Sequence, residues 1–62
     1  MNKEEIFSGI KIHKKSQPAA VLEIVQYTES VFYNAIKVEE AVHQNGVGYA
    51  GVLDLADWEE VK

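Results

Sequence analysis

The pattern of hydrophobic and polar residues differs between three parts of the chain. Residues 1–17 are largely polar, residues 18–45 form one long segment with many apolar positions, and residues 46–62 follow a cluster of glycines. These parts are too short to be separate domains. Residues 1–62 are therefore expected to form a single small domain.

A short strand is predicted near the N-terminus, in the sequence GIKIHKK. Ile10 and Ile12 alternate there with Lys11, His13 and Lys15. Because successive side chains of a strand point to opposite faces, the two isoleucines would face the core and the polar residues would face outward.

The central segment 18–45 is predicted to be an amphipathic helix. Its odd and even positions both mix polar with apolar residues, which a half-buried strand would separate. A helical projection separates them better. The polar arc holds Glu23, Gln26, Ser30, Asn34, Lys37 and Gln44, and the apolar arc holds Val21, Ile24, Val25, Thr28, Val31, Phe32, Ala35, Ile36, Val38 and Val42. Pro18 suits a first helical turn, and Asn45-Gly46 suits a helix end.

A hairpin is the alternative for the same residues. Val, Ile, Thr and aromatic residues are common in this segment, and they favour strands. The hairpin would turn at Thr28-Glu29-Ser30. In a third arrangement the helix breaks near Ser30, whose side chain would then cap a second helix.

The C-terminal part is predicted to contain a second short strand and a terminal helical turn. Tyr49–Leu53 follows the glycines, and Asp54 is placed to cap a turn carrying Leu55, Trp58 and Val61. With a helix over 18–45, the fold class is mainly α, with a short N-terminal strand and a short C-terminal element.

A helix over 18–45 would be too long for the rest of the chain to cover. It would span about 42 Å, whereas a compact domain of this length has a diameter of about 27 Å. The uncovered apolar side predicts a homo-oligomer, most simply a dimer. The expected interface contains Ile24, Val25, Thr28, Val31, Phe32, Ala35, Ile36, Val38 and Val42.

The net charge of −4 is unevenly distributed. Residues 1–17 have four lysines against two glutamates, whereas 18–46 and 47–62 each have one lysine against four carboxylates. The chain has no cysteine, no apolar run longer than Ala19–Leu22, and no apolar segment of a signal peptide. These features predict a soluble, cytoplasmic protein that has no membrane partner.

No catalytic, cofactor-binding or metal-binding residues are predicted. The serines have no nucleophile motif around them, and the glycines at 46, 48 and 51 lack the lysine and spacing of a phosphate-binding loop. Glu40-x-x-His43 has the spacing of a metal-binding pair, but no further glutamate would face the same way on one helix. An enzyme is therefore not expected.

Aromatic and acidic residues near the C-terminus are the predicted contact with a protein partner. Trp58 stands among four acids with few apolar neighbours, and tryptophan is enriched where partners are anchored. The predicted contact set is Trp58, Tyr49, Asp54, Asp57, Glu59 and Glu60. The expected function is that of a small acidic interaction protein, acting as an inhibitor, adaptor or regulator.

Two other functions stay open. A strand at Ile10–Lys15 followed by helices at 18–28 and 30–45 resembles the order of a ribbon-helix-helix dimer. The resemblance implies a DNA-binding regulator whose Lys11, His13 and Lys15 reach base edges. The chain departs from that family in lacking a glycine-bearing turn between the helices, and its acidity makes nucleic acid an unexpected partner. The third function is that of a structural subunit in a larger complex.

Overall fold

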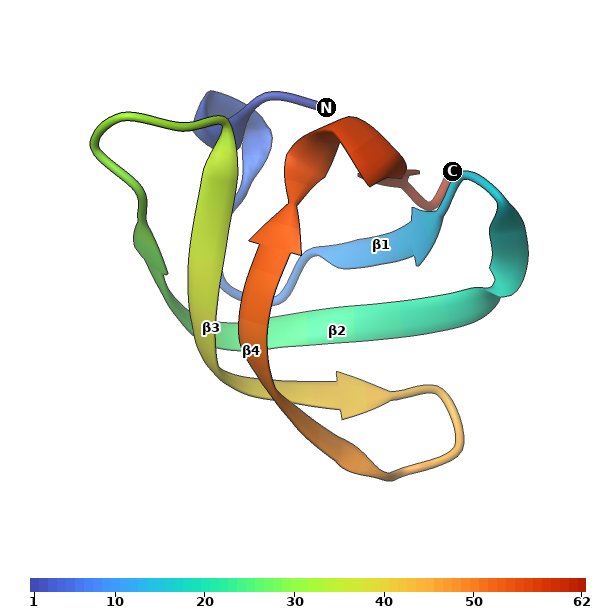
Figure 1. Cartoon of the computed structure of the whole chain (residues 1–62). Coiled ribbons are helices and arrows are strands. Elements are labelled where there is room, and N and C mark those ends of the chain that lie inside the picture. Colours follow the sequence, from blue (N-terminus) through green and yellow to red (C-terminus); the bar gives the residue numbers. More distant parts are fainter.

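The computed structural model describes residues 1–62 and consists of one five-stranded antiparallel sheet with two short 3-10 helices (Figure 1). In chain order the elements are η1 (Lys3–Glu5), β1 (Lys11–Lys14), β2 (Gln17–Glu29), β3 (Ala35–His43), β4 (Gly48–Asp54), η2 (Leu55–Asp57) and β5 (Trp58–Glu60). The strand order across the sheet is β4-β3-β2-β1-β5. The predicted fold class is therefore wrong: the protein is all-β, and no amphipathic helix is present.

The segment predicted as a helix is an antiparallel hairpin of β2 and β3, which was the alternative, although the chain turns over residues 30–34 and Thr28 and Glu29 still belong to β2. The strand alternation was hidden because it changes phase inside each strand. In β2 the inward-facing residues are Leu22 and Ile24, and then the half-buried Tyr27, since the register shifts between Ile24 and Tyr27. In β3 a second shift moves the buried phase from Val38 to Ala41. Such bulges insert extra residues, so a step of three replaces a step of two and imitates helical spacing.

Pro18 does not start a helix but lies at the exposed beginning of β2. β1 pairs with Gln17 and then only from Val21 onward, so no β1 partner faces Pro18 directly. Proline is tolerated at such a position because its missing N–H is not required by the ladder. The β-branched and aromatic composition of the segment therefore outweighed its apparent helical ends.

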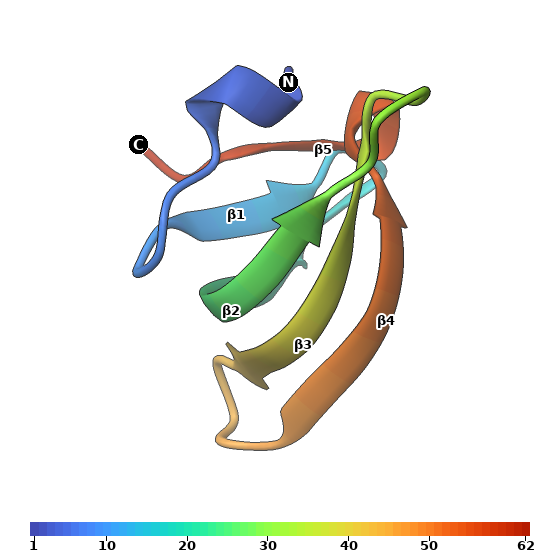
Figure 2. The ribbon, with the colours of Figure 1, turned by 90° about the vertical axis from the view of Figure 1, so that its left-hand side faces the viewer.

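The sheet curls so strongly that η2 alone connects its two edge strands, β4 and β5, along the chain (Figures 1 and 2). β5 crosses from the end of β4 to pair with β1 on the far side of the sheet. The Lys15 N–H donates to the Asp57 carbonyl at 2.9 Å, and the Leu55 N–H donates to the Asn34 carbonyl at 3.0 Å. The curl gives the sheet a concave inner face and a convex outer face.

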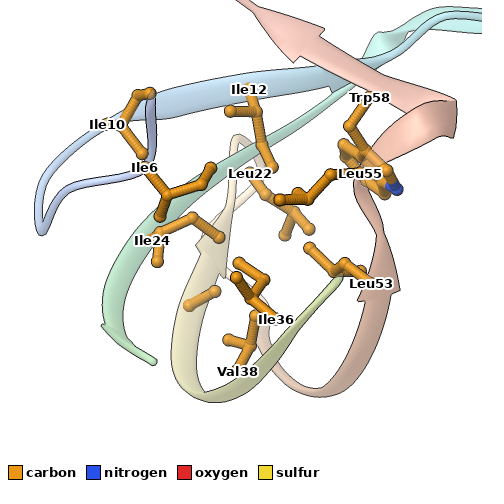
Figure 3. Packing of buried hydrophobic residues seen from close by; sticks show 11 residues of the cluster. Ile6, Ile10, Ile12, Leu22, Ile24, Ile36, Val38, Leu53, Leu55 and Trp58 are labelled. Atoms are coloured by element: carbon orange, nitrogen blue, oxygen red, sulfur yellow. The ribbon is translucent and has the colours of Figure 1, made fainter. Parts of the chain in front are cut away.

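The concave face holds a core of eleven apolar residues (Figure 3). They are Ile6, Ile10, Ile12, Leu22, Ile24, Ile36, Val38, Ala41, Leu53, Leu55 and Trp58. No buried side-chain polar atom lacks a hydrogen-bond partner. The radius of gyration, 10.4 Å, is that of a compact chain of this length. One copy therefore covers its own core, and the uncovered helix that predicted a homo-oligomer does not exist.

Both short strands predicted at the ends of the chain are present. Ile10 and Ile12 are buried in and beside β1 while Lys11 is exposed, as their alternation predicted. The predicted strand at Tyr49–Leu53 lies within β4. Asp54 caps the turn that follows, because its Oδ1 accepts a hydrogen bond from the Ala56 N–H at 3.1 Å. The turn is the short η2, which contains only Leu55 of the three apolar residues predicted in it, because Trp58 begins β5 and Val61 follows that strand.

Candidate interaction surface

The loop between β2 and β3, residues 30–34, exposes three successive large apolar side chains. Val31 is 82% exposed, Phe32 is 88% exposed and Tyr33 is 73% exposed. Figure 2 shows that this loop projects beyond the curled sheet. A run of exposed apolar residues lowers solubility and contributes nothing to the core, so it is expected only where it has a function. We call Val31–Tyr33 the apolar tip.

The backbone beneath the apolar tip is held in place by hydrogen bonds. The Lys3 ammonium donates to the carbonyl oxygen of Ser30 at 2.7 Å and to that of Tyr33 at 3.3 Å. The Ser30 N–H donates to the Ala35 carbonyl at 3.0 Å, and the Tyr33 N–H donates to Ser30 Oγ at 3.3 Å. The loop is therefore organised from within and anchored by a residue far away in the sequence.

Asn34 connects the end of the same loop to the N-terminal segment and to η2. Its Oδ1 accepts from the Lys3 N–H at 2.9 Å, and its Nδ2 donates to the Met1 carbonyl at 2.8 Å. Its own carbonyl accepts from Leu55 in η2. A fixed base lowers the conformational entropy that the loop would lose on binding, which favours affinity.

A groove of about 570 Å³ lies between this loop and the outer face of the sheet. Thr28, Lys37 and Val52 form one row across β2, β3 and β4, because each is paired with the next in register. Tyr33 and Asn34 line the groove from the loop side. We call this hollow the loop groove.

A second groove of about 420 Å³ lies on the other side of β4, at the opening of the curled sheet. Four residues of the predicted partner-binding set line it, namely Trp58, Tyr49, Asp54 and Asp57. Trp58 is 8% exposed and belongs to the core, so the groove presents little of its ring. Tyr49 is half-buried, packs against the core and meets the His43 ring edge-on at 5.8 Å. We call this hollow the mouth groove.

The other two residues of that set lie elsewhere. Glu59 and Glu60 are exposed on β5, and Glu59 Oε1 is 3.4 Å from His13 Nε2. They line a separate polar hollow together with Met1 and Lys15. The structure therefore brings together four of the six predicted residues.

The predicted oligomer interface does not form one face. Ile24, Ile36 and Val38 are buried in the core, and Ala35 is half-buried. Val25, Thr28 and Val42 are exposed on the strands, whereas Val31 and Phe32 belong to the apolar tip. Only these last two are exposed together.

The arrangement required for ribbon-helix-helix DNA recognition is absent. β1, which carries Lys11 and His13, is paired with β2 on one side and with β5 on the other. It cannot pair with a second copy to form a ribbon. The residues that would form the two helices of that fold form the strands β2 and β3 in this protein.

Sequence reasoning did not identify Tyr33, Val52, Lys3 or Asn34 as parts of a site. The sequence does indicate an exposed position for Tyr33, since SVFYN places three large apolar residues between Ser30 and Asn34, which favour turns. Lys3 and Asn34 could not be found in this way, because their contacts join distant segments.

No family model, curated protein or solved structure matches this chain. None of its helices has the length and apolar character needed to cross a membrane. No group of three or more His, Asp or Glu side chains is placed to hold a metal ion.

Proposed function

We propose that this protein is a non-enzymatic interaction module that binds a partner protein through the apolar tip, and so acts as an inhibitor, adaptor or regulator. The observation that supports the proposal is the exposure of Val31, Phe32 and Tyr33 on a loop with a hydrogen-bonded base. Aromatic side chains at interfaces bury large areas and often dominate the binding energy.

The partner is expected to offer an apolar pocket that receives Phe32. The loop groove beside Tyr33 would receive a complementary projection of the partner. A homo-oligomer is not part of the proposal, because the uncovered helix on which it rested is absent. The cytoplasm remains the proposed place of action, which the cysteine-free composition allows.

Site-specific photo-crosslinking tests the proposal. Phe32 is replaced by benzoylphenylalanine, and Val47 is replaced in the same way as a matched control. Val47 is also exposed and apolar but lies in the turn after β3, whereas the tip precedes β3. In extracts of the source cells we expect a protein adduct from position 32 that is missing from position 47. It should disappear when Val31 and Tyr33 are both replaced by serine.

Two outcomes would contradict the proposal. The first is the same set of adducts from positions 32 and 47. The second is binding of the protein to vesicles of neutral phospholipid that Phe32→Ser abolishes, since this would make the apolar tip a lipid contact. Once the partner is purified, Phe32→Ser should weaken its binding by at least about 2 kcal/mol, as for a central aromatic anchor.

A further inference from the structure

β4 is an open sheet edge. It pairs only with β3, and Figure 2 shows no segment beyond it. The direction of its backbone groups follows from two hydrogen bonds at the ends of the β3–β4 hairpin. Leu55 donates to the Asn34 carbonyl, and His43 donates to the Val47 carbonyl at 2.7 Å. Since successive residues of a strand alternate in direction, the odd-numbered residues of β4 face β3.

The even-numbered residues of β4 therefore direct their N–H and C=O groups away from the sheet. These are Gly48, Ala50, Val52 and Asp54. None of the backbone groups of these four residues takes part in a hydrogen bond outside the ladders. Their peptide groups form a row of free donors and acceptors along the edge, which another extended chain can pair with.

The other sheet edge, β5, is protected. It has only three residues, and the Met1 ammonium covers its beginning by donating to the carbonyls of Leu55 and Trp58 at 2.9 and 3.1 Å. Glu59 and Glu60 add two charges. By contrast, the stretch from Val47 to Leu53 has no charged residue and no proline. Exposed sheet edges normally carry charged residues or proline, which prevent pairing with another chain. β4 lacks both up to Leu53, so its composition favours pairing with an added strand.

The two grooves lie on the two sides of this edge. Val52 and Asp54 line both the loop groove and the mouth groove. Side chains of a strand added beside β4 would alternate between the two sides. One set would enter the loop groove near Tyr33 and Lys37, and the other would enter the mouth groove near Tyr49. Backbone pairing with pockets for alternate side chains is how proteins bind an added strand.

The charge distribution indicates which chain would be added. The segment 24–57, which contains the loop, β3, β4 and η2, has one lysine and five carboxylates, so it carries the whole net charge of −4. The remaining residues have five lysines and five glutamates and are neutral in sum. β4 itself has no charge before Asp54, but the two grooves beside it are lined by three carboxylates, Glu29, Asp54 and Asp57, against two lysines, Lys14 and Lys37. A second copy would bring the same net negative surroundings against these, whereas a basic segment is attracted to them.

We infer that β4 accepts an extended segment of the partner protein, with alternating apolar and basic residues, as an additional strand of the sheet. The inference rests on the proposed function and specifies how the partner is held. The apolar tip and the added strand would then act on the same side of the molecule, since the loop groove adjoins both.

The test uses a synthetic peptide of stated sequence, acetyl-Lys-Val-Lys-Val-Lys-Val-Lys-amide, titrated into isotope-labelled protein and followed by the backbone amide signals. We expect the largest shifts, and slower hydrogen exchange, at Gly48, Ala50 and Val52. The peptide with glutamate in place of lysine should bind more weakly, and increasing salt should weaken the lysine peptide. Equal binding of both peptides, or shifts centred away from β4, would overturn the inference.

Two modified peptides separate backbone pairing from side-chain contact while leaving the protein unchanged. One is N-methylated at its valines and the other at its lysines. An added strand directs only one of these two sets of N–H groups at β4. The peptide that is methylated on this set should bind roughly tenfold more weakly than the unmodified peptide, whereas the other methylated peptide should lose much less affinity. Equal effects of the two modifications would contradict pairing at the edge.

A matched pair of protein variants gives an independent measurement. Ala50→Pro removes an outward N–H that the ladder with β3 does not use, and Ala50→Ser keeps it. The proline variant should bind the peptide more weakly than the serine variant. Concentration-dependent dimerisation that Ala50→Pro abolishes would show a second copy on the edge and overturn the inference. Peptide binding at β4 without an adduct from Phe32 would support strand addition and contradict the proposed function of the apolar tip. An adduct from Phe32 without peptide binding at β4 would support the proposed function and contradict strand addition.

Discussion

Lys3 and Ser30 are 27 positions apart in the sequence, yet the Lys3 ammonium donates a hydrogen bond of 2.7 Å to the Ser30 carbonyl. This contact joins η1 to the base of the loop that carries the apolar tip. The same ammonium also reaches the Tyr33 carbonyl, and the Lys3 N–H is bonded to Asn34. A single residue of the N-terminal segment therefore fixes both ends of the loop.

Replacing Lys3 with methionine should loosen the loop, because the variant keeps the aliphatic stem but loses the donor. We expect the free energy of unfolding to fall by about 1 kcal/mol, the value of an ordinary hydrogen bond, because solvent screens the charge of this partly exposed ammonium. Amide exchange within residues 30–34 should become faster. Lys15→Met is the matched control, since the exposed Lys15 side chain makes no hydrogen bond or ion pair. Equal effects of the two substitutions would mean that Lys3 does not anchor the loop.

Phe32→Ser should leave stability almost unchanged, because the ring is nearly fully exposed. Urea unfolding should give a change within about 0.5 kcal/mol, as for most surface substitutions. Tyr27→Phe is a useful comparison, since the Tyr27 hydroxyl donates to the Ile6 carbonyl at 2.9 Å in a partly buried place. Its loss should cost about 1 kcal/mol. A large loss of stability in Phe32→Ser would mean that the tip serves folding and not binding.

Ile24 distinguishes the observed core from the predicted oligomer interface. It is fully buried within one copy, so Ile24→Ala should lower the free energy of unfolding by about 2–5 kcal/mol. A domain of this size has little stability to lose, and the variant should be largely unfolded at room temperature. Val52→Ala, at a side chain that is 70% exposed, should change stability by no more than about 0.5 kcal/mol. If Ile24→Ala instead folded normally and only reduced the molecular mass in sedimentation, Ile24 would lie between copies.

The two ends of the chain were easier to predict than its middle for a physical reason. In Ile10–Lys15 both buried isoleucines come before the register shift between His13 and Lys14, and in Tyr49–Leu53 the partly or fully buried residues alternate with exposed ones throughout, so both patterns are legible. β2 and β3 each contain a register shift, which replaces one alternating pattern by two that are out of phase. No count of odd and even positions over the whole segment can then succeed. The residue types still favoured strands.

The candidate site was harder to predict than the fold elements, because it depends on contacts between distant segments. Trp58 was expected to be exposed among acids, but β5 pairs with β1 and turns its ring into the core. The loop groove exists because Thr28, Lys37 and Val52 come into register across three strands. Phe32 was predicted to be left uncovered by its own chain on the apolar side of a helix. It is exposed in the structure, but it lies in a loop.

Gly51 should resist substitution for two separable reasons. Its φ of +154° is one that other residues rarely adopt, and an added Cβ would lie 2.9 Å from the Tyr49 hydroxyl oxygen. We expect Gly51→Ala to lower the free energy of unfolding by about 1–3 kcal/mol. In a Tyr49→Phe background the cost should shrink, because the nearest atom is removed, but the backbone cost should remain. Gly48→Ala is the control, since its Cβ would make only an ordinary contact with the Ala41 carbonyl at 3.9 Å. Urea unfolding of the single and double variants measures the coupling, and equal costs in both backgrounds would show that the hydroxyl is not the obstacle.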